Sequence, residues 1–433
     1  MTNSESRQSK WQFRFFTIWT GQQFSIIGSM VAQFALVWWL TKTTGSATIL
    51  ATATLVAMLP GVLFGPFAGA VVDRGNRRKI MIVADGLVAL AAALLAYLFW
   101  SGRMQVWHVY IIMLARSIGG MFHWPAMHAS TSLMVPKEQL SRVAGINQTM
   151  RGILDIVSPP LGALLLSLMP LHGIMALDVV TAAIAIAPLF FVAIPQPERR
   201  ALAIATGGKP SLWQDVREGL RYVSSWPGLL LLLTMATLLN FLLNPAFTLM
   251  PLLVSKYFGG EALQLGWMHS GWGLGIVLGG LTLSVWGGFR RRIVTSLIGV
   301  IGMGLGTLAI GLTPATLFVV ALVGISVAGF MNPIANGPLH AIFQAATAPE
   351  MQGRVFTLIG SLAAAMSPLG MAIAGPVADA IGVRAWFIMG GLACILMGAG
   401  ALFVPAIMHL EENGMSHQTV QAARASEKSE AAA

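Results

Sequence analysis

The stretch Gly69-Ala-Val-Val-Asp73-Arg74-Gly75-Asn76-Arg77-Arg78-Lys79 places five charged residues within seven positions, between apolar runs at about 47–72 and 80–100. Few soluble folds place so much charge between two such long apolar segments. Each run is long enough to cross roughly 30 Å of hydrocarbon at about 1.5 Å per residue, and the charged segment would then lie in water. The stretch therefore predicts two membrane-spanning helices joined by a charged loop.

The composition places the chain far outside the soluble class. Of its 433 residues, 56% are hydrophobic and 10% are charged, whereas soluble domains carry about 25% charged residues. A net charge of +10 could indicate nucleic acid, but the basic residues are distributed otherwise. If helices alternate from a cytoplasmic N-terminus, 20 of the 26 Lys and Arg lie inside, 4 lie outside and 2 lie within helices. This asymmetry follows the positive-inside rule, so it predicts a plasma-membrane protein with both termini cytoplasmic and no nucleic-acid partner.

The alternation of apolar runs and polar interruptions predicts an all-α membrane protein with twelve transmembrane helices. The longest interruption, 195–226, is expected to be a cytoplasmic linker between an N-terminal six-helix bundle (1–194) and a C-terminal six-helix bundle (227–408). The polar segment 409–433 is expected to be a disordered cytoplasmic tail. The expected spans are about 14–40, 46–72, 80–100, 107–133, 143–168, 173–194, 227–255, 264–286, 293–312, 315–341, 355–378 and 384–407.

The two halves are expected to be pseudo-repeats, because sequence features recur at a nearly constant offset. The matches are Arg77-Arg78-Lys79 with Arg290-Arg291-Arg292 and Pro125 with Pro338, both 213 residues apart, and Ser158-Pro159 with Ser367-Pro368, 209 residues apart. One such match arises easily by chance, but three in the same order favour a repeat. Parallel repeats are typical of facilitator-type transporters, whose substrate site lies between the halves near the bilayer midplane.

The charged loop also resembles the loop between helices 2 and 3 of the major facilitator superfamily, Gly-x-x-x-Asp-Arg-x-Gly-Arg-Arg. Asn76 stands where the family has its second glycine, and because Asn tolerates the left-handed conformation, the turn is expected to survive. Arg116 with Gly120 is similar to the family's helix-4 motif. Trp38-Trp39-Leu-Thr and Pro349-Glu-Met-Gln-Gly-Arg354-Val-Phe resemble the macrolide-efflux type of drug:proton antiporter. The resemblance implies the major facilitator fold and an exporter.

The charged loop is expected to stabilise the state that is closed to the cytoplasm. Asp85 lies six residues beyond Lys79, roughly 9 Å along the helix, and is interpreted as a structural counter-ion to the basic loop. The expected cytoplasmic gate comprises Gly69, Asp73, Arg74, Arg77, Arg78 and Asp85.

Polar residues form one stripe on the first helix of each half. The stripes are Gln22, Ser25, Ser29 and Gln33, and, 215 residues later, Thr237, Asn240, Asn244 and Thr248. Their spacing places each set on one helix face. Exposure of these polar side chains to lipid would be costly, so each face is expected to meet protein or water. One interpretation is that both stripes line a substrate cavity, with the aromatic residues Trp38, Trp39 and Phe241 in its wall. The alternative is hydrogen bonding between neighbouring helices.

Asp155 is the acid expected nearest the middle of the bilayer. It lies about 12 residues, or roughly 18 Å, into the fifth span, with Arg151 one turn earlier on the same face. Arg116 lies at similar depth in the fourth span, the hairpin partner. We expect Asp155 to carry a proton, with Arg116 and Arg151 as its charge partners. The alternative is a fixed ion pair between the two helices, and Asp85, Asp178 and His123 are the next candidates for the proton.

Taken with the resemblance, these features predict a secondary active exporter that works by alternating access. The resemblance implies amphipathic drugs, macrolide-like or of several classes, as its substrates and proton antiport as its driving force. The expected partners are the drug, protons and the lipid bilayer, and a monomer is expected. A siderophore or other metabolite exporter, an uptake symporter and a non-transporting receptor remain alternatives. An enzyme is not expected, because the sequence has no metal-ligand spacing, catalytic Cys setting or phosphate-binding loop, and no cofactor is predicted.

Overall fold

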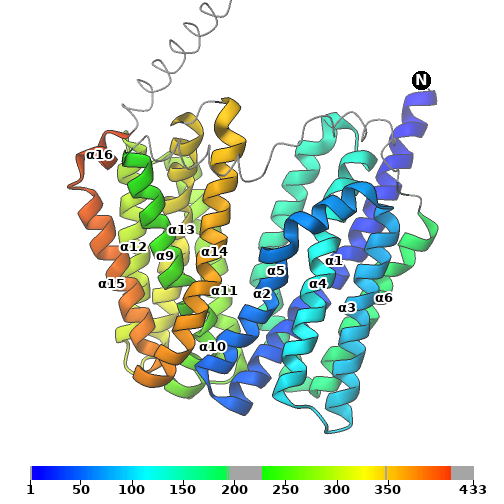
Figure 1. Ribbon diagram of the computed structural model, residues 1–433, viewed down its shortest axis with the longest axis horizontal. Coiled ribbons are helices and arrows are strands. Elements are labelled where there is room, and N and C mark those ends of the chain that lie inside the picture. The colour runs from blue at the N-terminus through cyan, green and yellow to red at the C-terminus, as the bar shows by residue number, and fades with distance from the viewer. Residues whose placement is uncertain (1, 193, 195–226, 347–348, 411–433) are drawn as a thin grey trace, which may run out of the picture. The chain divides into compact units, whose positions relative to one another are not determined.

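The computed structural model describes residues 2–192, 194, 227–346 and 349–410. Within these ranges, the side chains at 2–10, 66, 73, 345–346 and 349–364 are not described. The described residues form helices and turns with no strand (Figure 1). The predicted linker and all but two residues of the predicted tail lie outside this set. The elements are α1 (Thr2–Thr44), α2 (Ala47–Arg74), α3 (Arg77–Trp100), α4 (Val106–Met134), η1 (Lys137–Gln139), α5 (Leu140–Leu168), α6 (Leu171–Phe191), α9 (Pro227–Thr248), α10 (Met250–Leu252), η2 (Leu253–Tyr257), α11 (Ala262–Trp286), α12 (Arg292–Leu312), α13 (Phe318–Ala346), α14 (Pro349–Ile381), α15 (Val383–Ala401) and α16 (Pro405–Met408).

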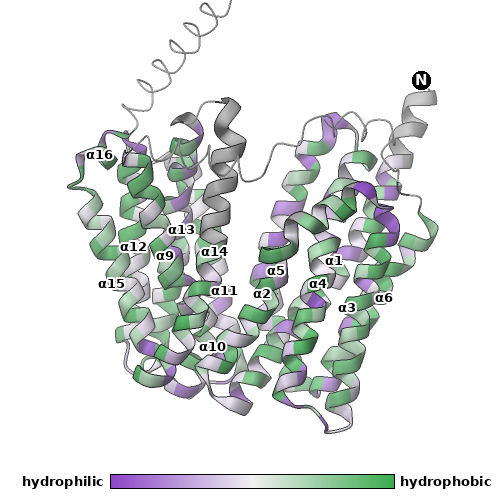
Figure 2. Cartoon of the chain, in the orientation of Figure 1, coloured by the Kyte–Doolittle hydropathy of each residue, from purple (hydrophilic) through white to green (hydrophobic). Residues whose placement is uncertain are grey.

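Most of these helices have the length and composition of membrane spans. Within the described part of the chain, 10 helices are long and apolar enough to cross a bilayer. Figure 2 shows them coloured mainly for hydrophobic residues. The long helix α4 is not among the ten; it carries Arg116, His123 and His128, which lower its hydropathy. The described chain is therefore an all-helical protein that crosses the membrane several times, and the count of twelve stays a prediction.

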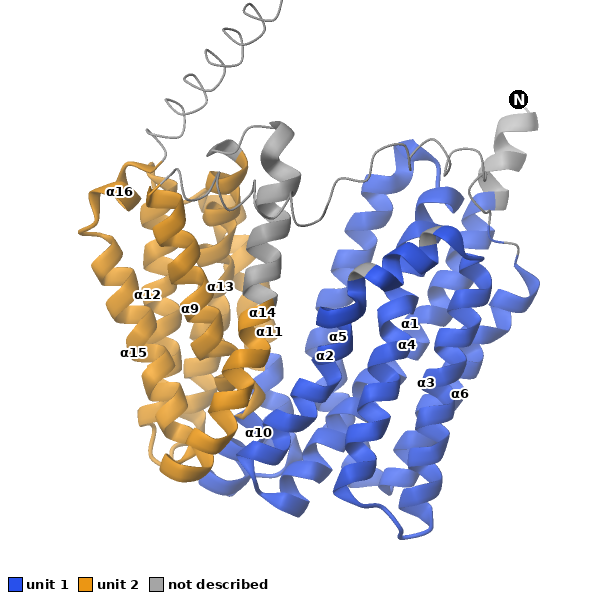
Figure 3. Cartoon of the chain, viewed as in Figure 1, with its two compact units in different colours: residues 1–208, 250–270 blue, residues 209–249, 271–433 orange. Residues whose placement is uncertain are grey.

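The chain divides into two compact units (Figure 3). Unit 1 comprises 1–208 and 250–270, and unit 2 comprises 209–249 and 271–433. The segment 250–270 thus groups with the N-terminal helices, although the sequence suggested a boundary near 227. Contacts within unit 1 explain this grouping: Glu261 forms an ion pair with Lys42 at 3.1 Å, and Ser270 donates a hydrogen bond to the Ile156 carbonyl.

Unit 1 is held together by close packing of α1 on α6 and of α3 on both α4 and α6. Gly21 and Gly28, two turns apart on α1, face α6, where an added methyl group would meet the backbone at Ile184 and overlap the side chain of Thr181. Small residues allow helices to approach closely in a membrane, where the hydrophobic effect does not drive their association. This approach brings polar side chains of α1 within reach of α6.

Unit 2 is organised around α12, which packs on α13 and α15. Glycines on two faces of α12 make the contacts: Gly299 meets the backbone at Ala335 on α13, and Gly304 meets Cys394 on α15. Ser296 adds a 2.6 Å hydrogen bond to the Ala335 carbonyl. The small residues of α12 therefore allow α13 and α15 to pack closely against it on two sides.

The loop between α2 and α3 is shaped by helix caps. The Gly75 N–H donates to the Val71 carbonyl, which ends α2, and the Asn76 side chain accepts from the Lys79 N–H, which begins α3. Asn76 has a φ of −79° in the extended region. The turn therefore does not use the left-handed conformation that Asn tolerates, because Asn76 serves as the N-cap of α3.

Candidate functional site

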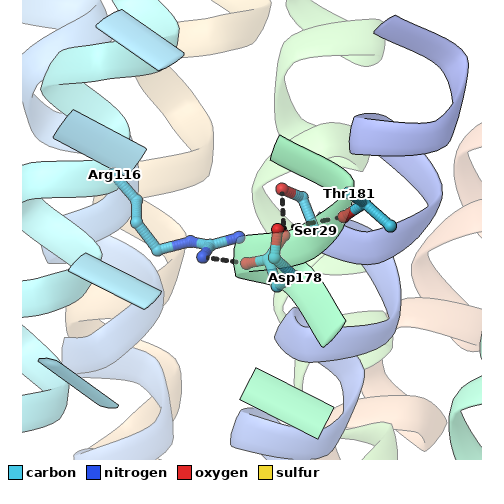
Figure 4. Close-up of polar contacts among 4 residues, drawn as sticks. All are labelled: Ser29, Arg116, Asp178 and Thr181. Atoms are coloured by element: carbon cyan, nitrogen blue, oxygen red, sulfur yellow. Dashed lines mark hydrogen bonds and ion pairs between the residues drawn. The ribbon is translucent and has the colours of Figure 1, made fainter. Parts of the chain in front are cut away.

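Two buried clusters of polar residues lie inside unit 1. In the first, Arg116 on α4 forms an ion pair with Asp178 on α6, with 2.5 Å between Nη1 and Oδ2 (Figure 4). The Ser29 hydroxyl donates to Asp178 Oδ1 at 3.0 Å from α1. The Asp178 side chain is 1% exposed and that of Arg116 is 12% exposed. This pair joins α4 and α6, and Ser29 ties α1 to it.

The sequence-based interpretation of Arg116 needs correction. The expected pairing of Arg116 with Asp155 is wrong, because the guanidinium bonds Asp178 instead. Asp178, named from the sequence only as a further candidate for the proton, bonds two side chains from other helices. The physical reason is position, because Asp155 is exposed on α5 whereas Asp178 is buried. Gly28 lets α1 approach α6 closely, which brings Ser29 to the same carboxylate.

The second cluster is centred on Asp85 of α3. Its Oδ2 accepts a 2.9 Å hydrogen bond from the side-chain amide of Gln22 on α1. Its Oδ1 lies 3.3 Å from His123 Nε2 on α4, within ion-pair distance, although the orientation does not make a hydrogen bond. Asp85 is 7% exposed. The partners of Asp85 are thus side chains of α1 and α4. These contacts do not support the expected role of Asp85 as a counter-ion to the basic loop.

Two arginines of the predicted gate, Arg77 and Arg78, bond to backbone carbonyls of other helices within unit 1. Arg77 donates to the Ala129 carbonyl of α4 at 2.6 Å, and Arg78 donates to the Leu189 and Phe190 carbonyls of α6. Leu189 and Phe190 lie in the last turn of α6. Carbonyls there lack partners within the helix and carry partial negative charge, which attracts the Arg78 guanidinium.

Three further gate residues have no described charge contact. Arg74 is exposed, and an added methyl group at Gly69 would meet nothing within 4 Å. The side chain of Asp73 lies outside the described residues. The gate function therefore stays a prediction.

Asp155 has a different environment from the two buried acids. It is exposed on α5, and it makes no hydrogen bond or ion pair with the rest of the described chain. Arg151, one turn earlier, places its guanidinium carbon 4.8 Å from the centre of the Trp124 ring on α4. This is a cation–π contact, so Arg151 already has an aromatic partner.

The polar stripe of α1 is partly used for contacts inside unit 1. Gln22 and Ser29 donate to Asp85 and Asp178, which favours interhelical bonding for these two residues. Ser25 is buried and Gln33 is half-buried. Trp38 is buried, with the Lys42 ammonium 5.1 Å from its ring centre.

The polar stripe of α9 bonds within its own helix. Thr237 and Asn240 donate to the Leu233 and Ala236 carbonyls, and Asn244 donates to Asn240 Oδ1 at 3.3 Å. These residues are half-buried, as are Phe241 and Thr248. The described bonds of this stripe do not reach another helix, so its side chains are not committed to interhelical contacts.

Sequence reasoning missed the partners of Asp85 and Asp178. A signal was present in the spacing: Gln22 and Ser29 are seven residues apart on α1, and Arg116 and His123 are seven apart on α4. Seven residues are two helical turns, so each pair shares one face. One acid bonds Gln22 and lies beside His123, and the other bonds Ser29 and Arg116, which gives the two clusters observed. Elsewhere in the described chain, no group of three metal-ligating side chains comes together.

The fold and the family comparison define a class of protein. The model of the Major Facilitator Superfamily matches residues 18–371 and 229–426. The chain therefore belongs to this superfamily, and it is a multi-pass membrane transporter. A bacterial homologue of the human lysosomal transporter Spinster shows the same fold, with a TM-score of 0.67 and 13% identity over 93% of this chain and 97% of that one.

Curated relatives place the chain more narrowly within the superfamily. It is 36% identical to macrolide efflux protein A of Streptococcus pyogenes over 406 residues, which cover 94% of this chain and 98% of the relative. It is 29% identical to the multidrug efflux pump Tap of Mycolicibacterium fortuitum over 399 residues, which cover 89% and 94%. The chain is thus similar to drug-efflux transporters along nearly its whole length.

Proposed function

We propose that this protein exports amphipathic drugs, with macrolides as the first class, from the cytoplasm across the plasma membrane. The similarity to a macrolide efflux protein over 94% of the chain carries this proposal. A multidrug pump among the relatives supports a range of amphipathic substrates. The proposed transporter crosses the membrane twelve times, has cytoplasmic termini and acts as a monomer.

The proposed driving force is inward movement of protons. Ionisable side chains within a membrane are costly, at least about 2.5–3.5 kcal/mol each on insertion scales, so they are paired or functional. Asp155 is the proposed proton-coupling acid, because its carboxylate is not held by an ion pair in the described chain and can bind and release a proton. Arg151 is its proposed charge partner, and Arg116 acts on coupling through its pair with Asp178.

The proposed transport cycle is alternating access between two repeats. The packing partners in the two units support the repeat, because α3 packs on α4 and α6 while α12 packs on α13 and α15. In this proposal the two polar stripes contribute to the substrate cavity. The half-buried Asn240, Phe241 and Asn244 are its strongest candidates, because their described bonds remain within α9.

In the proposed cycle, the α2–α3 loop stabilises the state that is closed to the cytoplasm. The bonds of Arg77 and Arg78 to carbonyls of α4 and α6 support a rigid base for this loop. Asp73 and Arg74 would then be the groups that form and break contacts during the cycle.

A drug-susceptibility panel tests the proposed export directly. Cells that lack other efflux pumps are compared with and without the protein, at matched expression, against macrolides, other amphipathic drugs and siderophore-dependent growth. Raised resistance to macrolides supports the proposal. Unchanged drug resistance together with altered siderophore release would establish the metabolite exporter instead, and increased drug sensitivity would indicate uptake.

A further inference from the structure

The two buried acids of unit 1 differ in the charge of their partners. Asp178 faces Arg116, whose guanidinium keeps its proton at every physiological pH, so this pair is neutral as it stands. Asp85 faces the uncharged amide of Gln22 and the imidazole of His123, which is charged only when it is protonated. Without a bound proton, the Asp85 cluster therefore carries one net negative charge inside a membrane helix bundle.

A buried net charge is costly, and one proton removes it. The cost of an unpaired carboxylate in a medium of low polarity is large enough that such groups neutralise. The distance leaves a place for that proton: His123 Nε2 is a buried nitrogen with no hydrogen-bond partner among the described residues, and it lies 3.3 Å from Asp85 Oδ1, so that a rotation of the imidazole or of the carboxyl group would align the two atoms. A proton between these two atoms satisfies the nitrogen and neutralises the carboxylate in one step.

The other charged groups near this cluster have their own partners. On α3, Arg77 and Arg78 donate to carbonyls of α4 and α6. On α6, the acid Asp178 bonds Arg116 of α4. None of the other ionisable side chains that the structure describes on these helices forms a hydrogen bond or an ion pair with Asp85 or His123: they are Arg14 and Lys42 of α1, Arg74 of α2, Lys79 and Tyr97 of α3, His108, Tyr110 and His128 of α4, and His172 of α6.

We propose that Asp85 and His123 form a proton-binding site, in which the Asp85 carboxyl group holds the proton and donates it to His123 Nε2 while Gln22 donates to the other carboxyl oxygen. The protonated carboxyl and neutral imidazole avoid the desolvation cost of a buried ion pair. The step is proton binding alone, since one O–H bond forms and water supplies the proton. In transport, this site would act as a second proton-coupling group beside Asp155, and that role rests on the proposed function.

The placement of this site suggests how it acts. Gln22 and Ser29 are two turns apart on α1, as are His123 and Arg116 on α4. The proton site therefore lies about 10 Å along the same two helices from the Arg116–Asp178 pair. A change in its charge acts on the helices that also carry the fixed pair, so protonation can alter the packing of α1 and α4.

Infrared spectroscopy of the purified full-length protein in lipid nanodiscs tests the site without any drug. A difference spectrum between alkaline and acidic conditions should contain a carboxylic-acid carbonyl band that shifts slowly in D₂O, because the group is buried. We expect this band to vanish in Asp85→Asn and to change frequency in His123→Gln, where the acceptor is different. It should remain at its wild-type position in His172→Gln and remain present in Asp178→Asn.

Other results would overturn the proposal. A band that persists in Asp85→Asn, or that is lost in Asp178→Asn, would place the proton on another group. A band that is unaffected by His123→Gln would show that the imidazole is not part of the site. Circular dichroism and elution profile check that each variant is folded, and His123→Gln keeps the test valid if Asp85→Asn does not fold. Failure of wild-type protein to pump against a gradient would reject proton antiport while leaving a confirmed band intact.

Discussion

Arg116 and Asp178 are 62 residues apart in the chain, yet their side chains meet at 2.5 Å in the interior of unit 1. Removing one partner of a buried ion pair leaves an uncompensated charge and costs about 3–5 kcal/mol, whereas removing both can be nearly neutral. We therefore expect Arg116→Gln and Asp178→Asn each to lower the yield and thermal stability of the purified protein. The Arg116→Gln/Asp178→Asn double variant should recover most of that loss.

The thermal unfolding midpoint, followed by tryptophan fluorescence in one detergent, measures this coupling. Arg116→Gln combined with Asp155→Asn is the matched comparison, because it pairs the same arginine change with the acid to which Arg116 is not bonded. Recovery of stability in that double variant, and not in the one with Asp178→Asn, would contradict the observed pairing.

Gly28 provides a second test, of helix packing. An alanine there would overlap the Thr181 side chain beside Asp178, and overpacking typically costs about 1–3 kcal/mol. Gly28→Ala should therefore reduce stability, while Gly61→Ala should not, because an added methyl group at Gly61 meets nothing within 4 Å. The same thermal midpoint measures both. Equal effects of the two substitutions would contradict the close approach of α1 to α6.

The sequence predicted the helices well because their signal is local. Each apolar run of roughly 20 residues is sufficient by itself to indicate a membrane helix. The charge partners depend instead on which helix faces which, and this is decided by packing at positions such as Gly28. Arg116 was assigned to Asp155 because helices 4 and 5 adjoin in sequence, but the acid that it bonds belongs to α6.

The same limit applies to the polar stripes. Spacing identified the shared face of Gln22 and Ser29, but spacing does not reveal what that face meets. Two acids on other helices accept their hydrogen bonds. The spacing therefore indicated the polar face of α1 without distinguishing a contact between helices from the wall of a cavity.

Arg78 should stabilise the end of α6. Its guanidinium donates to the Leu189 and Phe190 carbonyls, and hydrogen bonds to charged groups contribute about 1.5–3 kcal/mol. We expect Arg78→Ala to speed hydrogen–deuterium exchange in the last turn of α6, measured by mass spectrometry. Lys79→Ala is the control, because the Lys79 side chain is exposed. Equal exchange in the two variants would show that these bonds do not form in the membrane.

The charge asymmetry predicts the topology. A reporter fused after Gly208 should be cytoplasmic, and one fused after Gly260 should be external, because basic residues concentrate in the loops that remain inside. Alkaline phosphatase and green fluorescent protein fusions give opposite signals at each position. A cytoplasmic signal after Gly260, or an external one after Gly208, would reject the twelve-span arrangement.

The central claim is that a proton gradient drives export, with Asp155 as a coupling group. The most direct measurement is uptake of a radiolabelled macrolide into proteoliposomes with an acidic lumen, with and without an ionophore that collapses the pH difference. Wild-type protein should concentrate the drug above its external level and lose this accumulation with the ionophore. Asp155→Asn should equilibrate the drug without concentrating it, because its amide cannot exchange a proton. Wild-type uptake that stops at equilibrium, or uphill uptake by Asp155→Asn, would contradict the account.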